Sequence, residues 1–524
     1  MNENQRKELP IGIQTFSKLR EGNCYYADKT GLAVELANKV GAYYFLSRPR
    51  RFGKSLFVDT LRCLFEGRQE LFQGLAAEKK WDWSKKHPVI RFDFSAGPLK
   101  GKDRLVASIQ ESMRLNRLNL DIPRPDALPV TNYGGDFKDL IIQAHEKYGE
   151  KVVVLVDEYD KPILDNLIEQ PIAIEMRETL KELYSTIKGA DEHLQFVFIT
   201  GVSKFSKVSL FSGLNNLTDI TLEPEFSAIC GYTDNDIDTV FAPELKGLDR
   251  QRIKDYYNGY NWLGEGVYNP FDVLQLFRKR TFDNHWEETG STSFLMEQIA
   301  KRDIFSPDVD KIFASEDLIS SFDVDDIPIE ALMFQTGYLT IKSKIELPAL
   351  TEYELCYPNL EVKASVNRLM ARYLMGDKRA VGNNASALYR ALLANDFNQL
   401  RQVFQRFFSS IPFHWYTTSK LTQYEGYYAS IVYSHFAGLG LDVQAEDTTN
   451  MGRLDMVVRF NHCIYLFEFK VLELTPKGSA LAQIKQMKYA DKFKDGHTPI
   501  YLIGVEFSKT DRNIVGFEVE LVGA

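Results

Sequence analysis

The sequence predicts an α/β protein whose N-terminal part is a mostly parallel β-sheet with helices on both faces. Apolar runs rich in β-branched and aromatic residues alternate with helical stretches between about residues 40 and 225, and each run is long enough for one buried strand. The loop after the first run carries a Gly-Lys-Ser tripeptide, and a later run ends in two acids. Polar residues at strand ends are typical of sheets that hold ligands at their carboxyl edge.

The remaining elements follow in order along the chain. The predicted strands of the first part are 40–47, 87–95, 151–158 and 194–203, and the helices between them include 54–67 and 173–189. Shorter helices and aromatic turns follow to about residue 290, and residues 290–400 are expected to be mostly helical with a short β insertion at 332–343. In the last part we expect a helix at 424–440, two strands, another helix and a final strand near 498–507.

Composition excludes several classes of protein. At 524 residues, with 44% hydrophobic and 26% charged residues, the chain has an ordinary globular composition and is too long for one core. It has neither an apolar run of about 18 residues nor a signal-peptide core, so we expect a cytoplasmic protein. The five cysteines are widely spaced without a CxxC pair, which argues against disulfides and structural zinc. A net charge of −9 argues against a basic nucleic-acid clamp.

The loop at 47–55 predicts a phosphate-binding site. Gly53, Lys54 and Ser55 match the last three positions of GxxxxGK[ST]. The glycine lets the backbone approach a phosphate, the lysine reaches the β- and γ-phosphates, the serine hydroxyl binds Mg²⁺, and amide groups at the helix start cradle the anion. Arg51 and Phe52, in the same loop, are expected to be further contacts.

Acidic and polar residues at two later strand ends complete this prediction. We expect Asp157 to bind Mg²⁺ directly or through water and Glu158 to position or activate the attacking water. The alternative is a strand capped by solvated acids. Ser203, at the end of the strand 194–203, is expected to contact the γ-phosphate, and an ordinary strand-end turn is the alternative.

A second concentration of chemistry lies at 452–471, which predicts a β-hairpin. Asn461 and His462 are the expected turn, because asparagine favours the positive φ of tight hairpin turns. Phe460 would then oppose Cys463, and Asp455 would face Glu468 across the hairpin.

The side chain of Lys470 would share the face of Asp455 and Glu468, because it lies two residues beyond Glu468. Facing carboxylates repel each other unless a divalent cation binds both. Such a metal would activate water, and Lys470 would orient that water or stabilise the phosphorane, so the set suits phosphodiester cleavage. The alternative is a solvent-facing hairpin with a salt bridge.

The flanking helices add two candidates. Glu425 would supply a third carboxylate, and Gln483 would project toward the metal from a lysine-bearing helix at 479–494 that suits a DNA backbone. A surface glutamate and a solvated lysine face are the alternatives. His435 and His462 are expected to be ordinary residues, since an oxygen-only site suits Mg²⁺.

Together these motifs resemble the bacterial and archaeal AAA-ATPase-like family, whose members typically end in a PD-(D/E)XK nuclease domain. The segments that carry the resemblance are YYADKT (25–30), RPRRFGKS (48–55), VVLVDEYDKPI (153–163), FITGVSKFSKVSLFSGLNNL (198–217), YNGYNW and VYNPFDV (257–273), FQTGYLTI (334–341), GRLDMVV and YLFEFK. The resemblance covers essentially the whole chain. Two departures from general patterns are Arg48 at the first P-loop glycine and Leu454 in place of proline before Asp455.

The resemblance implies a P-loop ATPase domain at 1–225, a helical lid at 226–290, a mostly helical linker domain at 291–400 and a restriction-endonuclease-like α/β domain at 401–524. It implies ATP with Mg²⁺ or Mn²⁺ as cofactors, nucleic acid, in particular DNA, as partner, and a possible homo-oligomer. It implies that Lys54, Ser55, Asp157 and Glu158 form the ATPase site. Extra arginines in the loop would crowd or clamp the phosphates, and the YADKT stretch would be either an adenine contact or a packing strap.

The leading functional hypothesis is a nuclease whose DNA cleavage is gated by ATP binding or hydrolysis, and a role against foreign or mobile DNA would fit by analogy. The first alternative is an ATP-dependent switch that binds DNA or a protein partner through a non-cleaving C-terminal domain. The second is a P-loop enzyme that acts on a small molecule.

Overall fold

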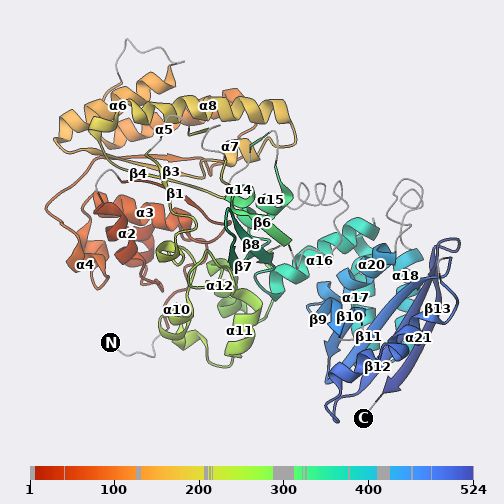
Figure 1. Ribbon diagram of the computed structural model, residues 1–524. Helices are drawn as coiled ribbons and strands as arrows, with labels where there is room; N and C mark the ends of the chain where they lie inside the picture. The colour runs from red at the N-terminus through yellow and green to blue at the C-terminus, as the bar shows by residue number, and fades with distance from the viewer. Residues whose placement is uncertain are drawn as a thin grey trace. The chain divides into compact units, whose positions relative to one another are not determined.

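The structure is a computed structural model that describes residues 6–39, 42–124, 132–205, 210–211, 214, 216–286, 312–320, 323–324, 327–375, 378–409, 425–449, 452–473 and 475–522. The chain forms two compact units (Figure 1). The first contains Met1–Asp283 and Phe313–Asn359, and the second contains Asn284–Ile312 and Leu360–Ala524. Within the described residues, none of the helices has the length and apolar character needed to cross a membrane.

A parallel five-stranded sheet is the centre of the first unit. Its order is β2-β3-β4-β1-β5, and the strands are β1 (Ala42–Ser47), β2 (Val89–Asp93), β3 (Val152–Asp157), β4 (Leu194–Gly201) and β5 (Thr218–Asp219). The first four strands coincide with the four predicted runs, so the predicted parallel α/β sheet is confirmed. Because β4 lies between β1 and β3, the carboxyl end of β4 separates the loop after β1 from the acids after β3.

Helices cover both faces of this sheet (Figure 1). One face packs against α5 (Lys102–Asn119), α6 (Tyr133–Tyr148) and α8 (Gln170–Lys188), which share a core with Phe92, Val154 and Val156. The other face packs against α3 (Lys54–Phe65), whose first residues follow the phosphate-loop motif. The short helices around them are α1 (Phe16–Glu21), α2 (Thr30–Ala37), α4 (Ala77–Lys80) and α7 (Lys161–Leu164).

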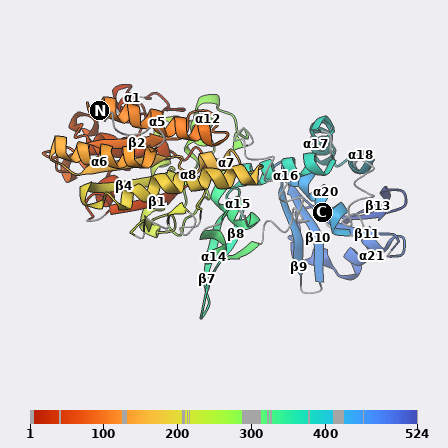
Figure 2. The same cartoon turned by 90° about the horizontal axis from the view of Figure 1, so that it is seen from above.

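The middle of the chain adds short helices and a small sheet. The helices are α10 (Asp234–Thr239), α11 (Arg250–Tyr257), α12 (Pro270–Lys279), α14 (Glu316–Ser320) and α15 (Ile329–Thr336). A three-stranded sheet has the order β6-β8-β7, with β6 (Ile312–Ser315), β7 (Thr340–Glu346) and β8 (Thr351–Cys356). The first half of the predicted β insertion at 332–343 is therefore helical, because α15 continues to Thr336 and is followed by Gly337, whose φ of 85° ends the helix. The β7–β8 hairpin extends away from its unit (Figure 2).

The second unit is built on a mixed five-stranded sheet with the order β13-β12-β11-β10-β9. Its strands are β9 (Asp442–Thr449), β10 (Gly452–Phe460), β11 (Cys463–Val471), β12 (Ile500–Ser508) and β13 (Asn513–Val522). One face packs against α17 (Lys378–Leu393), α18 (Phe397–Ser409) and α20 (Glu425–Gly438), and α16 (Leu360–Met375) packs on α20. The other face packs against α21 (Ser479–Gln486). The sequence reading missed β9 and β13, the two edge strands.

His435 of α20 is buried in the apolar core of this second unit. Its ring stacks on Phe407 with 3.7 Å between centroids, and its Nδ1 donates to the carbonyl of Ile431 at 2.8 Å. The Nε2 atom has no hydrogen-bond partner among the described residues. Burial lowers the pKa of His435 to about 4 from the ordinary 6.5. His435 is therefore a neutral core residue.

This burial predicts an acid-labile second unit. Between pH 6.5 and about 4 the unfolded chain binds the His435 proton and the folded chain does not, so the free energy of unfolding falls as the pH is lowered through this window. The loss from this residue approaches about 3 kcal/mol at the lower end. Urea unfolding at pH 7 and pH 4.5 should show a smaller pH effect in His435→Leu than in the wild type. Equal pH effects in both proteins would contradict the prediction.

Candidate functional site

The loop between β1 and α3 has the backbone of an anion cradle. Gly53 precedes α3 in the left-handed region with φ 93°, and Arg51 also has a positive φ of 67°. Lys54 is buried, and its Nζ donates to the carbonyl oxygens of Arg48 and Pro49, both at 2.9 Å. Burial lowers the pKa of Lys54, and the nearby acids Asp157 and Glu158 counteract this effect. The loop therefore wraps around one ammonium group at the start of a helix, where anions bind favourably.

Arg48 points away from this cradle. It is fully buried, and its guanidinium donates to the carbonyls of Ser47 and Thr221 at 2.9 Å and of Phe226 at 3.1 Å. It also stacks over the ring of Trp262 at 4.1 Å. The expectation that extra arginines crowd or clamp the phosphates is therefore wrong for Arg48, which ties the loop to the chain after β5.

Arg48→Met is expected to lower the free energy of unfolding by about 3 kcal/mol, because buried carbonyl groups lose their donor. The change removes the hydrogen bonds and keeps most of the aliphatic stem. Urea unfolding of wild type, Arg48→Met and Arg48→Lys would measure it. Lysine retains the charge but cannot form the fork of hydrogen bonds, so it should restore only part of the loss. A loss below 1 kcal/mol in the methionine variant would contradict this role.

Other loop side chains also face the protein. Phe52 is buried against Tyr260 and Trp262, with ring centroids 4.7 Å and 5.5 Å apart. The guanidinium of Arg51 lies 4.1 Å from the centre of the Phe271 ring. Any contact of Arg51 and Phe52 with a nucleotide would therefore come most directly from their backbone amides.

The two acids at the carboxyl end of β3 differ in environment. Asp157 is fully buried, and neither carboxylate oxygen accepts a well-formed hydrogen bond from a described residue. Burial raises the pKa of Asp157, the nearby Ser55 hydroxyl lowers it, and the carboxylate of Asp93 raises it. Glu158 has a positive φ of 51°, which is strained for a residue with a side chain. Burial raises the pKa of Glu158 as well, and Lys54 lowers it.

The end of β4 is fastened to the segment after β3. Asp160 accepts hydrogen bonds from the Ser203 hydroxyl at 2.5 Å and from the Ser203 amide at 2.6 Å. The Tyr159 hydroxyl donates to the Ser203 carbonyl at 3.0 Å and accepts from the Phe205 amide at 3.1 Å. Ser203 is thus held beside the acids, and its hydroxyl is already bonded to Asp160. Sequence reasoning missed Asp160 and Tyr159, although both follow the paired acids directly.

The YADKT stretch (26–30), together with Tyr25 before it, makes several structural contacts. Tyr25 donates to Glu244 at 3.1 Å, and Lys29 pairs with Asp236 at 2.8 Å. Asp28 accepts from the backbone amides of Thr30 and Ala76, at 2.9 Å and 2.7 Å. Glu244, Asp236 and Ala76 are far from the stretch in sequence, which fits the packing-strap alternative, and the adenine contact stays a prediction.

The predicted hairpin is confirmed, with the predicted register between Phe460 and Met456, and the direct pairing of Asp455 with Glu468 stays a prediction. Asn461 and His462 have φ 48° and 59°, and Phe460 pairs with Cys463 across the turn. Pairing continues to Met456 opposite Phe467. The Asp455 carboxylate accepts a hydrogen bond at 2.8 Å from the amide of Phe469, the residue between Glu468 and Lys470.

Three predicted side chains meet on the α21 face of β11. Glu468 is buried, and its Oε1 accepts from Lys470 Nζ at 2.9 Å and from the side-chain amide of Gln483. The Lys470 side chain is 13% exposed, and that of Glu468 is 1% exposed. Glu425 begins α20, but its side chain lies outside the described residues.

The donors suit a hard cation. Among the described residues, no group of three or more His, Cys, Asp and Glu side chains could hold a metal. Mg²⁺ is nevertheless commonly held by one or two carboxylates together with water and phosphate oxygens. Asp455 and Glu468 are the predicted pair in the second unit. Asp157, with the hydroxyl of Ser55, supplies an oxygen set in the first.

Tyr489 is a neighbour of this centre that sequence reasoning missed. It is buried, and its hydroxyl donates to the carbonyl of Arg453 at 3.0 Å. Burial raises the pKa of Tyr489, a hydrogen bond with Gln483 lowers it, and Glu468 raises it. Tyr489 therefore braces the glutamine that holds Glu468.

The lysine-bearing helix is shorter than predicted and less cationic. It ends at Gln486, and Lys488 has a positive φ of 51°, which ends the regular helix. Lys485 pairs with Glu520, Lys492 with Asp447 and Lys494 with Asp491, at 2.7, 2.7 and 2.6 Å. These pairs reduce the positive charge offered to a nucleic-acid backbone.

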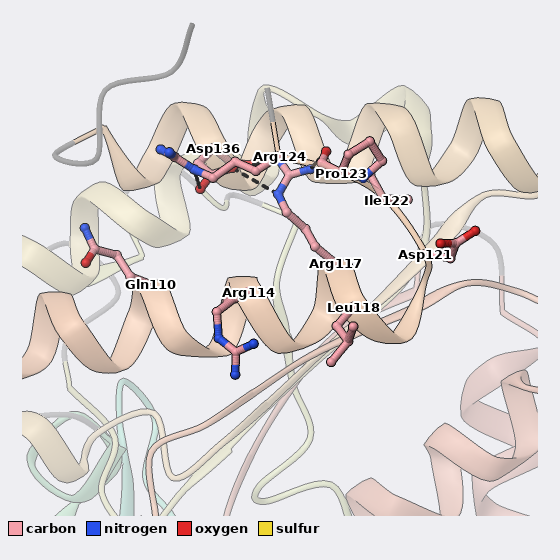
Figure 3. A pocket seen from close by; sticks show the side chains of 9 residues that line it. All are labelled: Gln110, Arg114, Arg117, Leu118, Asp121, Ile122, Pro123, Arg124 and Asp136. Atoms are coloured by element: carbon pink, nitrogen blue, oxygen red, sulfur yellow. Dashed lines mark hydrogen bonds and ion pairs between the residues drawn. The ribbon is translucent and has the colours of Figure 1, made fainter. Parts of the chain in front are cut away.

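A cavity of about 700 Å³ lies between α5 and α6 (Figure 3). Its arginines already have acidic partners: Arg117 pairs with Asp136 at 2.6 Å, and Arg124 pairs with the same carboxylate at 3.1 Å. None of the predicted site residues lines this cavity. We assign no function to it.

Comparisons with known proteins match family models to the segment that contains the phosphate-loop motif and to the segment that contains the C-terminal hairpin. Residues 10–211 match a family model described as predicted AAA-ATPase, and residues 423–517 match a model of the PD-(D/E)XK nuclease superfamily. A protein of Azotobacter chroococcum mcd 1, described as an uncharacterized protein in the vnfD 5' region, is 54% identical over 520 residues, which cover 99% of this chain and 100% of the relative. No solved structure matches the chain significantly.

Proposed function

The chain belongs to the AAA-ATPase-like family with a C-terminal PD-(D/E)XK nuclease-superfamily domain, and from this premise we propose that it is an ATP-gated, Mg²⁺-dependent deoxyribonuclease. The two domains give the chain ATPase and nuclease potential. The DNA substrate, the gating by ATP and a role against foreign or mobile DNA are parts of the proposal.

The observation that carries the proposal is the meeting of Glu468, Lys470 and Gln483 on one sheet face, beside Asp455. A buried carboxylate that holds a lysine ammonium is an arrangement suited to phosphoryl chemistry. A divalent cation bound by Asp455 and Glu468 would supply an activated water and offset charge on the phosphate. Lys470 would stabilise the negative charge that develops during cleavage, and Gln483 would keep Glu468 oriented.

The proposed nucleotide site uses the loop before α3. Lys54 would exchange its carbonyl partners for the β- and γ-phosphates, and amides at the start of α3 would bind the same anion. Asp157 and Ser55 would hold Mg²⁺, and Glu158 would orient the attacking water. Ser203, whose hydroxyl donates to Asp160, would contact the γ-phosphate at the end of β4.

A second candidate is the ATP-dependent switch with a non-cleaving C-terminal domain. The pairing of Lys485, Lys492 and Lys494 with acids favours it, because it leaves a weak basic surface beside the candidate centre. This candidate predicts ATP-dependent DNA or protein binding that does not require Lys470.

Cleavage of linear and circular DNA in Mg²⁺ or Mn²⁺, with and without ATP, tests the proposal. We expect metal-dependent cutting whose rate changes with ATP. A parallel RNA substrate tests the choice of DNA. Normal ATP binding without cutting of any substrate would refute the nuclease and favour the switch.

A further inference from the structure

Beside the acids of the proposed nucleotide site lies an arginine that the proposed mechanism does not use. Arg91 and Asp93 are on β2, and Asp93 pairs in register with Asp157 on β3. Side chains of paired residues in neighbouring parallel strands leave the same face of the sheet, as do residues two apart on one strand. Arg91, Asp93 and Asp157 therefore share the face that α3 covers.

The distances make Arg91 the centre of an acidic group. Its guanidinium lies 2.9 Å from Asp93, 3.5 Å from Asp59 of α3 and 4.0 Å from Asp157. The backbone of Arg91 is itself fixed, because its amide and carbonyl both bond to the side chain of Asn116, at 2.9 and 2.8 Å. The strand therefore holds a cation at a fixed place beside the Asp157 carboxylate.

Asp157 has the burial and hydrogen-bonding state expected of a carboxylate that binds a cation. Its side chain is 1% exposed, and neither oxygen accepts a well-formed hydrogen bond from a described residue. A buried carboxylate without such partners is unfavourable unless a nearby positive charge compensates it. Asp93 adds a second carboxylate whose side chain is 35% exposed, so it can be reached from solvent.

We propose that Arg91 and Asp93 are positioning residues of the nucleotide site: Asp93 is the second carboxylate toward the divalent cation that accompanies the nucleotide, and Arg91 is a built-in counter-ion that competes with this cation. Arg91 then sets the Mg²⁺ concentration at which nucleotide binding is strengthened. This inference rests on the proposed ATP binding by the first unit and does not depend on nuclease activity.

Substitutions of Arg91 and Asp93 should shift the Mg²⁺ dependence of nucleotide binding in opposite directions. A fixed positive charge a few ångströms from the metal position repels the metal. Arg91→Met should therefore lower the Mg²⁺ concentration that strengthens nucleotide binding. Removal of a carboxylate charge weakens attraction of the metal, so Asp93→Asn should raise this Mg²⁺ concentration. Structural damage at either position would weaken binding in both variants, and opposite shifts therefore separate competition from misfolding.

The experiment measures binding of a fluorescent methylanthraniloyl derivative of ATP to the full chain as Mg²⁺ is added. The half-maximal Mg²⁺ concentration should fall roughly fivefold in Arg91→Met and rise roughly fivefold in Asp93→Asn. Arg91→Lys, which keeps the charge, should stay near the wild type. Arg114→Met is the matched control, since Arg114 is an exposed arginine of α5 paired with Glu111.

Shifts in the same direction, or shifts within twofold of the wild type in both variants, would overturn the inference and leave the proposed function standing. A wild-type chain that binds no nucleotide with Mg²⁺ would overturn the proposed function and this inference with it.

Discussion

Replacement of Lys470 by alanine is expected to lower the rate of DNA cleavage by about 100-fold or more, the usual cost of removing one group that stabilises transition-state charge. The ammonium lies 2.9 Å from the buried carboxylate of Glu468. Asp455 and Glu468 remain in the variant, so metal binding should persist while the rate falls. Initial rates on a linear duplex in Mg²⁺ would measure the effect.

Lys485→Ala is the matched control for this variant. Lys485 lies on α21, is half exposed and pairs with Glu520 on the surface, so its loss should change the cleavage rate less than twofold. A Lys470→Ala protein that cuts as fast as the wild type would place the catalytic centre elsewhere or identify the activity as a contaminant. Retained DNA binding without cutting would support the assigned role of Lys470.

The hairpin shows what local sequence patterns can predict. Asn461 and His462 mark the turn, and strand geometry then sets the pairing of every residue up to Met456 and Phe467. The meeting of Glu468 and Lys470 follows from alternation alone, because both lie on one strand two residues apart. Likewise, the limits of the four apolar runs in the first part predict which residues lie at the end of each strand.

The remaining features depend on contacts between distant segments. Arg48 was read as a loop residue near phosphate, but its acceptors at Thr221 and Phe226 are more than 170 positions away, so nothing local marks it as buried. The edge strand β9 has a polar sequence, DVQAEDTT, that resembles a loop until it pairs with β10. The closeness of Arg91 to Asp157 arises only when β2 and β3 become neighbours.

Replacement of Lys54 by alanine is the second large expected effect, a loss of ATP hydrolysis of about 100-fold or more, because one ammonium at the phosphate position disappears. Lys54 also holds the loop through two 2.9 Å hydrogen bonds to carbonyls, so the variant loses part of the cradle as well. Phosphate release would measure hydrolysis, and the melting temperature would report whether the unit still folds. Lys102→Ala, an exposed lysine of α5, is the control.

The same variant decides whether the two activities are coupled. If nucleotide binding gates cleavage, ATP should change the cutting rate of the wild type and leave that of Lys54→Ala unchanged, although every residue of the proposed nuclease centre is intact. An ATP effect on cutting that survives in Lys54→Ala would contradict gating through this loop. Cutting that ignores ATP in both proteins would leave two independent activities on one chain. Lys54 and Lys470 belong to different compact units, so an effect of the first on cleavage would be a coupling between the two units.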